Sequence, residues 1–472
     1  MEHKKHVRFP GRLVFVGFGS VGQGSLPLLL RHIDMPRERI VIVTADERGR
    51  KEAESYGIKF VVRPLTRENH RAVLEPLIGP GDFLLNLSVD VASVALIEFA
   101  CERGALYLDT CIEPWLGGYT DPNVSPSHRS NYGQREEVLK LRAKFRNGAP
   151  TVIPTHGANP GLISHWIKQA MVNIARDIHG EVDVPKTREK WAQLAMKLGI
   201  KVIHCAERDT QAAHPRKRRW EFVNTWSVDG FIGEGSQPCE LGWGSHEKHF
   251  PHDGKRHEFG CGAAIYLTRP GASVLVRSWT PSEGHYHGFL ITHSESISVP
   301  DYYTVRNGDK VIYRPTCHYA YHPCDETVLS VHELAGRNWV GQEQRRILMD
   351  EIYDGTDELG ALLMGHARGA YWYGSQITVH EARKLAPYNN ATSIQVAAGV
   401  MGGVVWAMEN PKRGITEPDE MDFQRVLELA SPYLGKLIGV YSDWTPLHGR
   451  NHPFPEDLDT SDPWQFKNFR VM

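Results

Sequence analysis

Cysteine is scarce in this chain of 472 residues, and no two cysteines stand close together in the sequence. The seven cysteines lie at positions 101, 111, 205, 239, 261, 317 and 324, with no C-x-x-C pair among them. This scatter argues against a disulfide framework and against a structural zinc site. It favours the reducing environment of the cytoplasm.

The sequence also lacks an excess of charge of either sign. Lys plus Arg number 54 and Asp plus Glu number 56, so the net charge is -2 at pH 7. No overall electric field would draw such a protein to nucleic acid or to an anionic membrane, and we expect neither as a partner. Charged ligands would have to be recognised by local groups.

Long apolar runs are missing as well. The most apolar later stretch, residues 394–408, contains Gln395 and is shorter than the roughly 20 residues that span a bilayer. We expect it to form a buried helix whose glycines permit close packing. Near the start, a short apolar run enters a glycine-rich turn, unlike the longer apolar core of a signal peptide, so we predict no secretion signal.

The first part of the chain alternates short β-branched runs with longer helical patterns, which is typical of a doubly wound parallel sheet. The chain is long enough for two domains or one elaborated domain. The expected strands are residues 12–18, 39–46, 58–63, 82–88 and 105–111.

From about residue 160 the pattern changes to mixed strands with many aromatic residues, and it becomes helical again over 389–440. Turn dipeptides, Asp-Gly at 229 and 253 and Asn-Gly at 307, favour antiparallel strands in an α+β domain. We predict an α/β protein in which an N-terminal Rossmann domain (1–155, joined by 386–445) precedes an α+β substrate and dimerisation domain (156–385) and a C-terminal tail (446–472).

A glycine-rich turn follows the first expected strand and opens the first expected helix. Gly17, Gly19 and Gly22 form a G-x-G-x-x-G motif, and a second strand ends at Asp46. In this context the motif predicts dinucleotide binding, with the pyrophosphate at the helix N-terminus beside Ser20 and Val21. Asp46 would bind the adenosine ribose and favours NAD, although Arg48 and Arg50 nearby leave NADP as an alternative.

Polar residues stand at the carboxyl ends of two later strands, where ligands of open parallel sheets bind. They occur in "NLSVD" (86–90) and "DTCIEPW" (109–115). Asp90 and Glu113 are thereby placed where a nicotinamide ring and its substrate should meet; helix capping and a surface charge are the alternatives. The further residues that we expect at the cofactor are Asn86, Ser88, Asp109, Thr110 and Asn159.

The segment "PTHGANPGLIS" (154–164) opens a helical pattern. Its plain structural interpretation is that Asn159 caps the helix and Pro160 occupies the first helical position.

Several segments together resemble the bacterial homospermidine synthase family, whose relatives include saccharopine dehydrogenase and carboxynorspermidine dehydrogenase. They are the glycine turn, "DTCIEPW", "HGANPGLIS", "CAERDTQ" (205–211), "NTWSVDGFIGEGSQPCELGWG" (224–244) and "ITHSESIS" (291–298). The resemblance implies a homodimer that retains NAD and condenses two putrescine molecules into sym-homospermidine, releasing ammonia. The residues that match the substrate site of the family are Asp90, Glu113, Asn159, Glu207, Trp226, Glu234, His293 and Asp357.

The chemistry of a diamine suits those residue types. A dication favours carboxylates and an aromatic face, which Trp226 would supply, whereas an aminodicarboxylate would require arginine clamps. Among the catalytic candidates Glu207, His293 and Asn159, either Glu207 or His293 would be the base. Without the resemblance, Trp226 would be a core residue of a strand, Glu207 and Glu234 surface acids, and His293 a wall residue of a strand.

A metal site and two other functions also have to be considered. The histidine-rich segment at 245–259 has loop character and lacks a helical ligand pair, so we expect a solvated loop and no metal there. A carboxynorspermidine- or saccharopine-type dehydrogenase with a net change of cofactor, and a non-catalytic NAD-binding sensor, are the alternatives to homospermidine synthesis.

Overall fold

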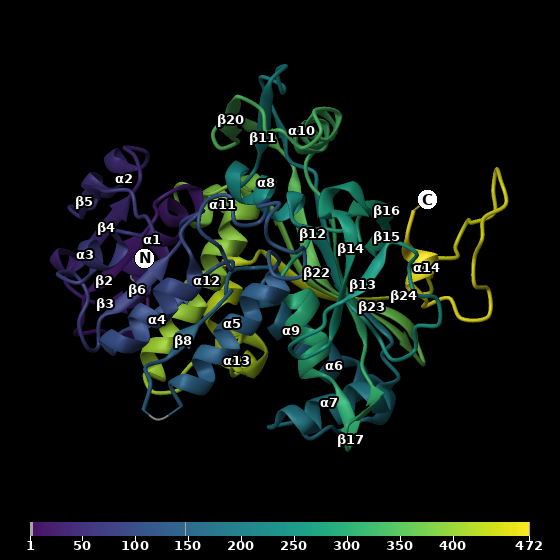
Figure 1. Cartoon of the computed structure of the whole chain (residues 1–472). Helices are drawn as coiled ribbons and strands as arrows, with labels where there is room; N and C mark the ends of the chain where they lie inside the picture. The colour runs from purple at the N-terminus through teal and green to yellow at the C-terminus, as the bar shows by residue number, and fades with distance from the viewer. Residues whose placement is uncertain (1–2, 147, 472) are drawn as a thin grey trace.

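The computed structural model describes residues 3–146 and 148–471. Two sheets dominate it, and Figure 1 shows the N-terminal sheet on the left and the larger sheet on the right, with α12 between them. The N-terminal sheet corresponds to the alternating strand and helix patterns at the start of the sequence, and the larger sheet to the mixed-strand pattern after about residue 160.

The N-terminal sheet is parallel throughout, with the strand order β5-β4-β2-β6-β7-β8. The five strands expected from the β-branched runs are confirmed, and β8 is a short sixth strand that the sequence did not suggest. The strands are β2 (Leu13–Val16), β4 (Ile40–Thr44), β5 (Lys59–Val62), β6 (Phe83–Asn86), β7 (Leu106–Asp109) and β8 (Val152–Ile153). The helices are α1 (Ser20–His32), α2 (Arg50–Ser55), α3 (His70–Leu74), α4 (Ser93–Arg103) and α5 (Asn131–Lys144), and a short pair joins β1 (Val7–Arg8) to β3 (Ile33–Asp34).

The larger sheet has ten strands and mixed directions, because β19 runs parallel to β9 while the other pairs are antiparallel. Its main path is β13-β14-β12-β19-β9-β22-β23-β24, with β15 and β16 attached at β19. The strands are β9 (Val202–Asp209), β12 (Pro238–Gly242), β13 (Gly254–Arg256), β14 (Ala264–Pro270), β15 (Leu275–Thr280), β16 (Gly284–Phe289), β19 (Thr316–His322), β22 (Thr356–His366), β23 (Gly369–Thr378) and β24 (Lys436–Ser442).

Smaller elements surround this sheet. The short strand pairs are β10 (Ala212–Ala213) with β21 (Ile352–Asp354), β11 (Glu221–Asn224) with β20 (Gln344–Ile347), and β17 (Val305–Asn307) with β18 (Lys310–Tyr313). The helices are α6 (Leu162–His179), α7 (Arg188–Leu198), α8 (Val228–Ser236), α9 (Glu295–Tyr302), α10 (Asp325–Gly336), α11 (Val379–Leu385), α12 (Ala391–Glu409), α13 (Phe423–Ala430) and α14 (Phe466–Phe469).

Helix α12 is the apolar segment that the sequence predicted to be buried, and the prediction is confirmed. It begins with a capping box in which Asn390 accepts a hydrogen bond from the backbone of Ser393. A side chain at Gly399 would lie 2.1 Å from the carbonyl oxygen of Gly157, so glycine is needed for this close approach. Among the described helices it is the one long and apolar enough to cross a bilayer, but 94% of its most apolar window is buried within the protein.

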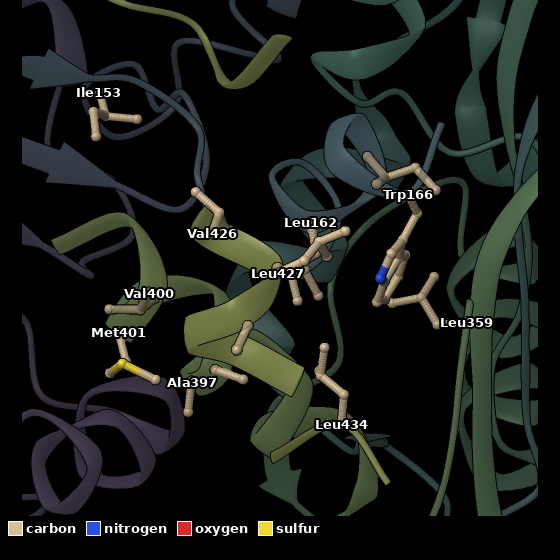
Figure 2. Packing of buried hydrophobic residues seen from close by; sticks show 14 of the residues in the cluster. Ile153, Leu162, Trp166, Leu359, Ala397, Val400, Met401, Val426, Leu427 and Leu434 are labelled. Carbon is tan, nitrogen blue, oxygen red and sulfur yellow. The ribbon is translucent and has the colours of Figure 1, made fainter. Parts of the chain in front are cut away.

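One hydrophobic cluster joins the two parts of the molecule. Figure 2 shows Trp166 of α6 beside Leu359 of β22, and Val400 and Met401 of α12 facing away toward α1. Helix α12 packs against α1 and α13, and α13 packs against α6, so the helices form a continuous layer between the sheets. This layer connects the parallel sheet to the larger sheet.

Two local expectations are wrong. Residues 436–442 form β24, which pairs with β23, and do not continue a helix. Asp229 and Gly230 lie inside α8 and form no turn, because Ser227 caps that helix by accepting a hydrogen bond from the backbone of Gly230. The hairpin at Asn307, by contrast, is confirmed between β17 and β18.

Candidate functional site

The turn between β2 and α1 has the geometry that a pyrophosphate requires. Gly17 has a φ of 83°, and a side chain there would lie 2.7 Å from the Cα atom of Ser88. At Gly19 an added Cβ atom would meet nothing within 4 Å, and no side chain caps the helix N-terminus that follows. The turn therefore leaves free space in front of unpaired N–H groups, and the residues present fit a dinucleotide.

The other glycine and its neighbours support the turn from inside. A side chain at Gly22 would lie 3.0 Å from the ring of Phe18, so this position serves close packing. Ser20 is buried and Val21 half-buried at the start of α1. Both backbone amides belong to the first turn of the helix, where they would face the phosphates.

Asp46 follows β4, where a ribose-binding acid is expected, and it is already paired. Its carboxylate accepts hydrogen bonds from the backbone and the Nε atom of Arg48, and the Nη2 atom lies 2.7 Å away. These hydrogen bonds lower the pKa of Asp46, so the carboxylate is ionised at neutral pH. A ribose would have to share this carboxylate with Arg48.

At the ends of β6 and β7, several predicted cofactor residues bond to the protein itself. Asn86 accepts a hydrogen bond from Ser88 and donates to Tyr107, which donates to Asp109 at 2.7 Å. Asp109 also accepts from the backbone of Thr155 at 2.6 Å, and burial raises its pKa to about 6. Asn86 and Asp109 thus fix the ends of the two strands, whereas Ser88 and Thr110 are only partly buried and remain accessible.

Four acids and one imidazole from segments that are far apart in the sequence meet beside these strand ends. Glu113 is 3% exposed, and its pKa is raised first by burial and then by the charges of Glu234 and Asp90. His293 lies between two of the acids, with Nε2 at 3.0 Å from Glu234 and Nδ1 at 3.2 Å from Glu295. We call Asp90, Glu113, Glu234, His293 and Glu295 the histidine cluster.

The charges of the histidine cluster set its protonation. Burial alone would lower the pKa of His293, but the charges of Glu295 and Glu234 outweigh burial and raise it to about 10. The imidazole is therefore a cation at neutral pH. Asp90 is half-buried with a φ of 63°, and burial followed by the charge of Asp229 raises its pKa.

Glu207 is a second centre of the site, on β9. Its Oε2 atom accepts hydrogen bonds from Asn159 at 3.1 Å and from the hydroxyl of Tyr319. Burial raises the pKa of Glu207 to about 8, with Tyr319 acting in the opposite direction. The predicted role of Asn159 as a helix cap is wrong, because α6 begins at Leu162 after Gly161 and the Asn159 amide points to Glu207.

Asp357 extends the second centre along the neighbouring strand. It lies on β22 opposite Asp209 of β9 and is fully buried. Its pKa is raised well above the usual value by burial and then by the charges of Glu207 and Asp209. Neither Asp357 oxygen accepts a hydrogen bond from any residue that the structure describes.

Aromatic side chains connect the two centres. Trp226 donates its indole N–H to the hydroxyl of Tyr321 at 3.3 Å, and Tyr321 stacks on Tyr319 at 5.1 Å. Tyr319 lies 4.5 Å from the ring of His293. Trp226 stands between β11 and α8 and His293 directly before α9, so the strand interpretations of both are wrong.

Sequence reasoning missed several residues of this arrangement: Asp209, Glu295, Tyr319 and Tyr321. The alternation in "HYAYH" (318–322) was the available signal, because residues two apart in a strand share a face. Only the structure shows that β19 pairs with β9, which carries Glu207. Without that pairing, the sequence could not assign Tyr319 and Tyr321 to the site.

The histidine-rich segment has separate structural roles. His246 binds the carbonyl of Trp464, His249 pairs with Asp459 at 2.8 Å, and His257 is buried against the ring of Tyr132. The solvated-loop interpretation is wrong for His257. Within residues 3–146 and 148–471, no group of three or more His, Cys, Asp or Glu side chains could hold a metal ion.

The fold and the site together define a two-domain protein with a Rossmann nucleotide turn and a buried acidic site at the ends of the parallel strands. Family models match both parts: the saccharopine dehydrogenase NADP binding domain over residues 13–153 and the saccharopine dehydrogenase C-terminal domain over 157–441.

More specific relatives cover the whole chain. It is 52% identical over 468 residues to the homospermidine synthase of Blastochloris viridis, covering 98% of each chain, and 50% identical to that of Mesorhizobium japonicum, covering 98% of this chain and 96% of the other. The crystal structure of the Legionella pneumophila homospermidine synthase in complex with NAD is 49% identical, with a TM-score of 0.92 and 98% of each chain covered. The chain therefore belongs to the homospermidine synthase family.

Proposed function

We propose that this protein condenses two putrescine molecules into sym-homospermidine and ammonia. The observation that carries this proposal is a set of three buried carboxyl groups, Glu113, Glu207 and Glu234, none of which pairs with a Lys or Arg of the described chain. Glu234 has His293 as its counter-ion, but Glu113 and Glu207 form no ion pair within the described residues. A buried charge without a partner is costly, so such a site suits a cationic ligand.

An amino acid substrate would need an arginine to bind its carboxylate, and a diamine would not. Among the described residues of the matching segments, no arginine is free for that role. Arg208, the arginine within the matching segments, pairs with Glu283 and Asp325. Neighbouring residues of a strand face opposite sides of the sheet, so Arg208 points away from Glu207. A saccharopine-type substrate with several carboxylates would meet like charges here.

Of the two candidate bases, Glu207 gives up its own proton more readily than His293 and is therefore the better proton acceptor. A base must be unprotonated when it acts, and the pKa of His293 is raised to about 10 whereas that of Glu207 is about 8. Glu207 therefore takes a proton from the substrate ammonium, with Asn159 bonded to the carboxylate. His293 holds Glu234 and Glu295 in place as their counter-ion.

NAD supplies a reversible hydride acceptor for the amine-bearing carbon, which makes the loss of ammonia and the attack of a second amine possible. Gly17, Gly19 and the N-terminus of α1 would hold its pyrophosphate, with Asp46 at the ribose. The chain then has to exclude water from the imine, and the burial of Glu113, Glu207, His293 and Asp357 provides that dry environment.

The decisive experiment is incubation of the enzyme with putrescine and a catalytic amount of NAD. We expect homospermidine and ammonia in equal amounts by mass analysis and ammonia assay, with no net accumulation of NADH at steady state. A stoichiometric change in NADH would instead indicate a dehydrogenase. Binding of NAD without any new polyamine would indicate a sensor and contradict the proposal.

The homodimer follows from the resemblance and the cytoplasmic location from the scattered cysteines, and both stay predictions. We propose a homodimer in the cytoplasm, with putrescine and related diamines as partners and no nucleic acid or membrane. Light scattering of the purified protein measures the first of these directly.

A further inference from the structure

Tyr319 makes a contact with Glu207 that the proposed chemistry does not yet use. It lies on β19, which runs parallel to β9, and its hydroxyl donates to Oε2 of Glu207. Asn159 donates to the same oxygen at 3.1 Å. Both donors therefore occupy Oε2, and Oε1 has no hydrogen-bond partner among the described residues.

The hydroxyl of Tyr319 is held in place by its surroundings. The side chain is 3% exposed. Its ring stacks on Tyr321 with an interplanar angle of 11°, and the ring of His293 lies 4.5 Å away. Burial raises the pKa of Tyr319 well above its usual value, so the hydroxyl keeps its proton and can donate a hydrogen bond to Glu207.

We infer that Tyr319 is a positioning residue that orients Glu207 and stabilises its ionised form, so that Oε1 is the atom that receives the substrate proton. This inference rests on the proposed function of Glu207 as the base. The physical reason is that a hydrogen bond to a carboxylate favours the charged state, and two donors on one oxygen fix the rotation of the carboxylate.

Other titratable groups also face Glu207 and have to be kept constant in a test. They come from β9, β22, β16, β19 and the segment before α9: Cys205, Asp209, Asp357, Tyr286, Tyr321 and His293. The substitution Tyr319→Phe retains the ring and its stacking and leaves all of these groups in place. Any change in the ionisation of Glu207 then reports the lost hydroxyl.

The test compares the pH profiles of kcat/KM for homospermidine formation in the wild type and in Tyr319→Phe. The active form of Glu207 is ionised, so activity should fall as the pH drops through its pKa. Loss of the donor should move this acidic limb upward by about 1 to 2 pH units, with activity partly recovered at high pH. NAD binding should be unchanged.

Tyr303→Phe is the matched control. Tyr303 is also fully buried, at the end of α9, and its hydroxyl has no partner among the described residues. Removing that hydroxyl should leave both turnover and the acidic limb unchanged.

A uniform loss of activity at every pH in Tyr319→Phe, or an unshifted limb, would overturn the inference. If Glu207→Gln turns over normally, the proposed base itself is wrong. If Glu207→Gln is inactive and the acidic limb of the Tyr319→Phe pH profile is unshifted, Glu207 keeps its role as the base and only the role of Tyr319 is wrong.

Discussion

At the scale of single residues, the site depends on acids that are buried without a Lys or Arg partner among the described residues. Glu207 is 2% exposed and accepts hydrogen bonds only from neutral donors, an amide and a phenol. Neutral donors raise the stability of the carboxylate without cancelling its charge. The charge stays available to an ammonium ligand, which a lysine or arginine partner would have neutralised.

Glu207→Gln should therefore abolish proton abstraction while leaving cofactor binding intact. We expect homospermidine formation to fall by about 100-fold or more, since that is the usual contribution of a general base. Turnover is measured by mass analysis of polyamines and NAD affinity by calorimetry.

Glu247→Gln is the control for that substitution. Glu247 is likewise buried and its pKa is raised to about 7 by burial, but it bonds to Thr316 and to the backbone of Phe466 near the C-terminus. Its variant should turn over near normally. Near-normal turnover of Glu207→Gln would remove Glu207 from the mechanism.

Trp226 offers an aromatic face whose orientation depends on Tyr321. Trp226→Leu should raise the KM for putrescine by about 2- to 30-fold, corresponding to the loss of a cation–π contact of roughly 0.5–2 kcal/mol. Trp226→Phe retains a ring but loses the indole N–H, so its KM should be intermediate. An unchanged KM in the leucine variant would show that the ring only packs against Phe231, which lies 5.9 Å away.

The sequence predicted which residues belong to the site better than it predicted the contacts that these residues make. The motifs selected Glu207, His293 and Glu234, which the fold brings near one another, but they could not show that His293 lies between two carboxylates. Asn159 looked like a helix cap because Asn before Pro is common at helix starts. Its actual contact with Glu207 crosses between segments 48 residues apart, which local patterns do not encode.

At the scale of elements, the β2–α1 turn separates a structural glycine from a ligand-facing one. Gly17 has a positive φ and no space for a side chain, whereas Gly19 has an ordinary φ of -75° and open space. An alanine at position 19 is therefore compatible with the protein and would meet only a bound pyrophosphate.

Gly19→Ala should weaken NAD binding by roughly 5- to 150-fold, if steric crowding at the phosphates costs about 1–3 kcal/mol. Its thermal unfolding should match that of the wild type. Gly336→Ala is the control, because a side chain there also meets nothing within 4 Å but lies at the end of α10. Equal NAD affinity in both variants would contradict the assignment of the phosphate site.

Periodicity predicted the parallel strands well, because buried β-branched runs bounded by turns are short and distinct. It failed where tertiary pairing decides the outcome. Lys436–Ser442 follows helical sequence and becomes β24 because the edge of β23 is available to it. Asp229 and Gly230 read as a turn but lie in α8, since Ser227 supplies a helix cap.

At the scale of the whole molecule, buried ion pairs connect the two parts of the chain. Arg135 on α5 makes two hydrogen bonds to Glu417, at 2.6 and 2.8 Å, and one to Asp301 of α9 at 2.8 Å. Its side chain is only 6% exposed. Helix α5, which lies between β7 and β8 of the N-terminal sheet, is thereby tied to α9, which begins at Glu295 of the histidine cluster.

Arg135→Met should destabilise the protein by about 3–5 kcal/mol, because it leaves the largely buried carboxylate of Glu417 without its ion-pair partner and Asp301 with Arg188 alone. Arg142→Met is the matched control on the same helix, since its pair with Glu420 is about one-third exposed and should contribute only about 0–1 kcal/mol. Urea unfolding at neutral pH measures both.

The pH dependence of the unfolding free energy shows whether Arg135→Met loses stability through its ion pairs or through its packing. Burial opposes the ionisation of Asp301 and Glu417, but Arg135, with Arg188 at Asp301 and Arg142 at Glu417, outweighs burial and lowers the pKa of both carboxyl groups below their usual values. The stabilisation is therefore present above the unfolded pKa of about 4 and is lost as the pH falls through the lower folded values. The difference between the wild type and Arg135→Met should shrink in acid, whereas a difference that is constant with pH would indicate lost packing, because packing does not depend on carboxylate charge.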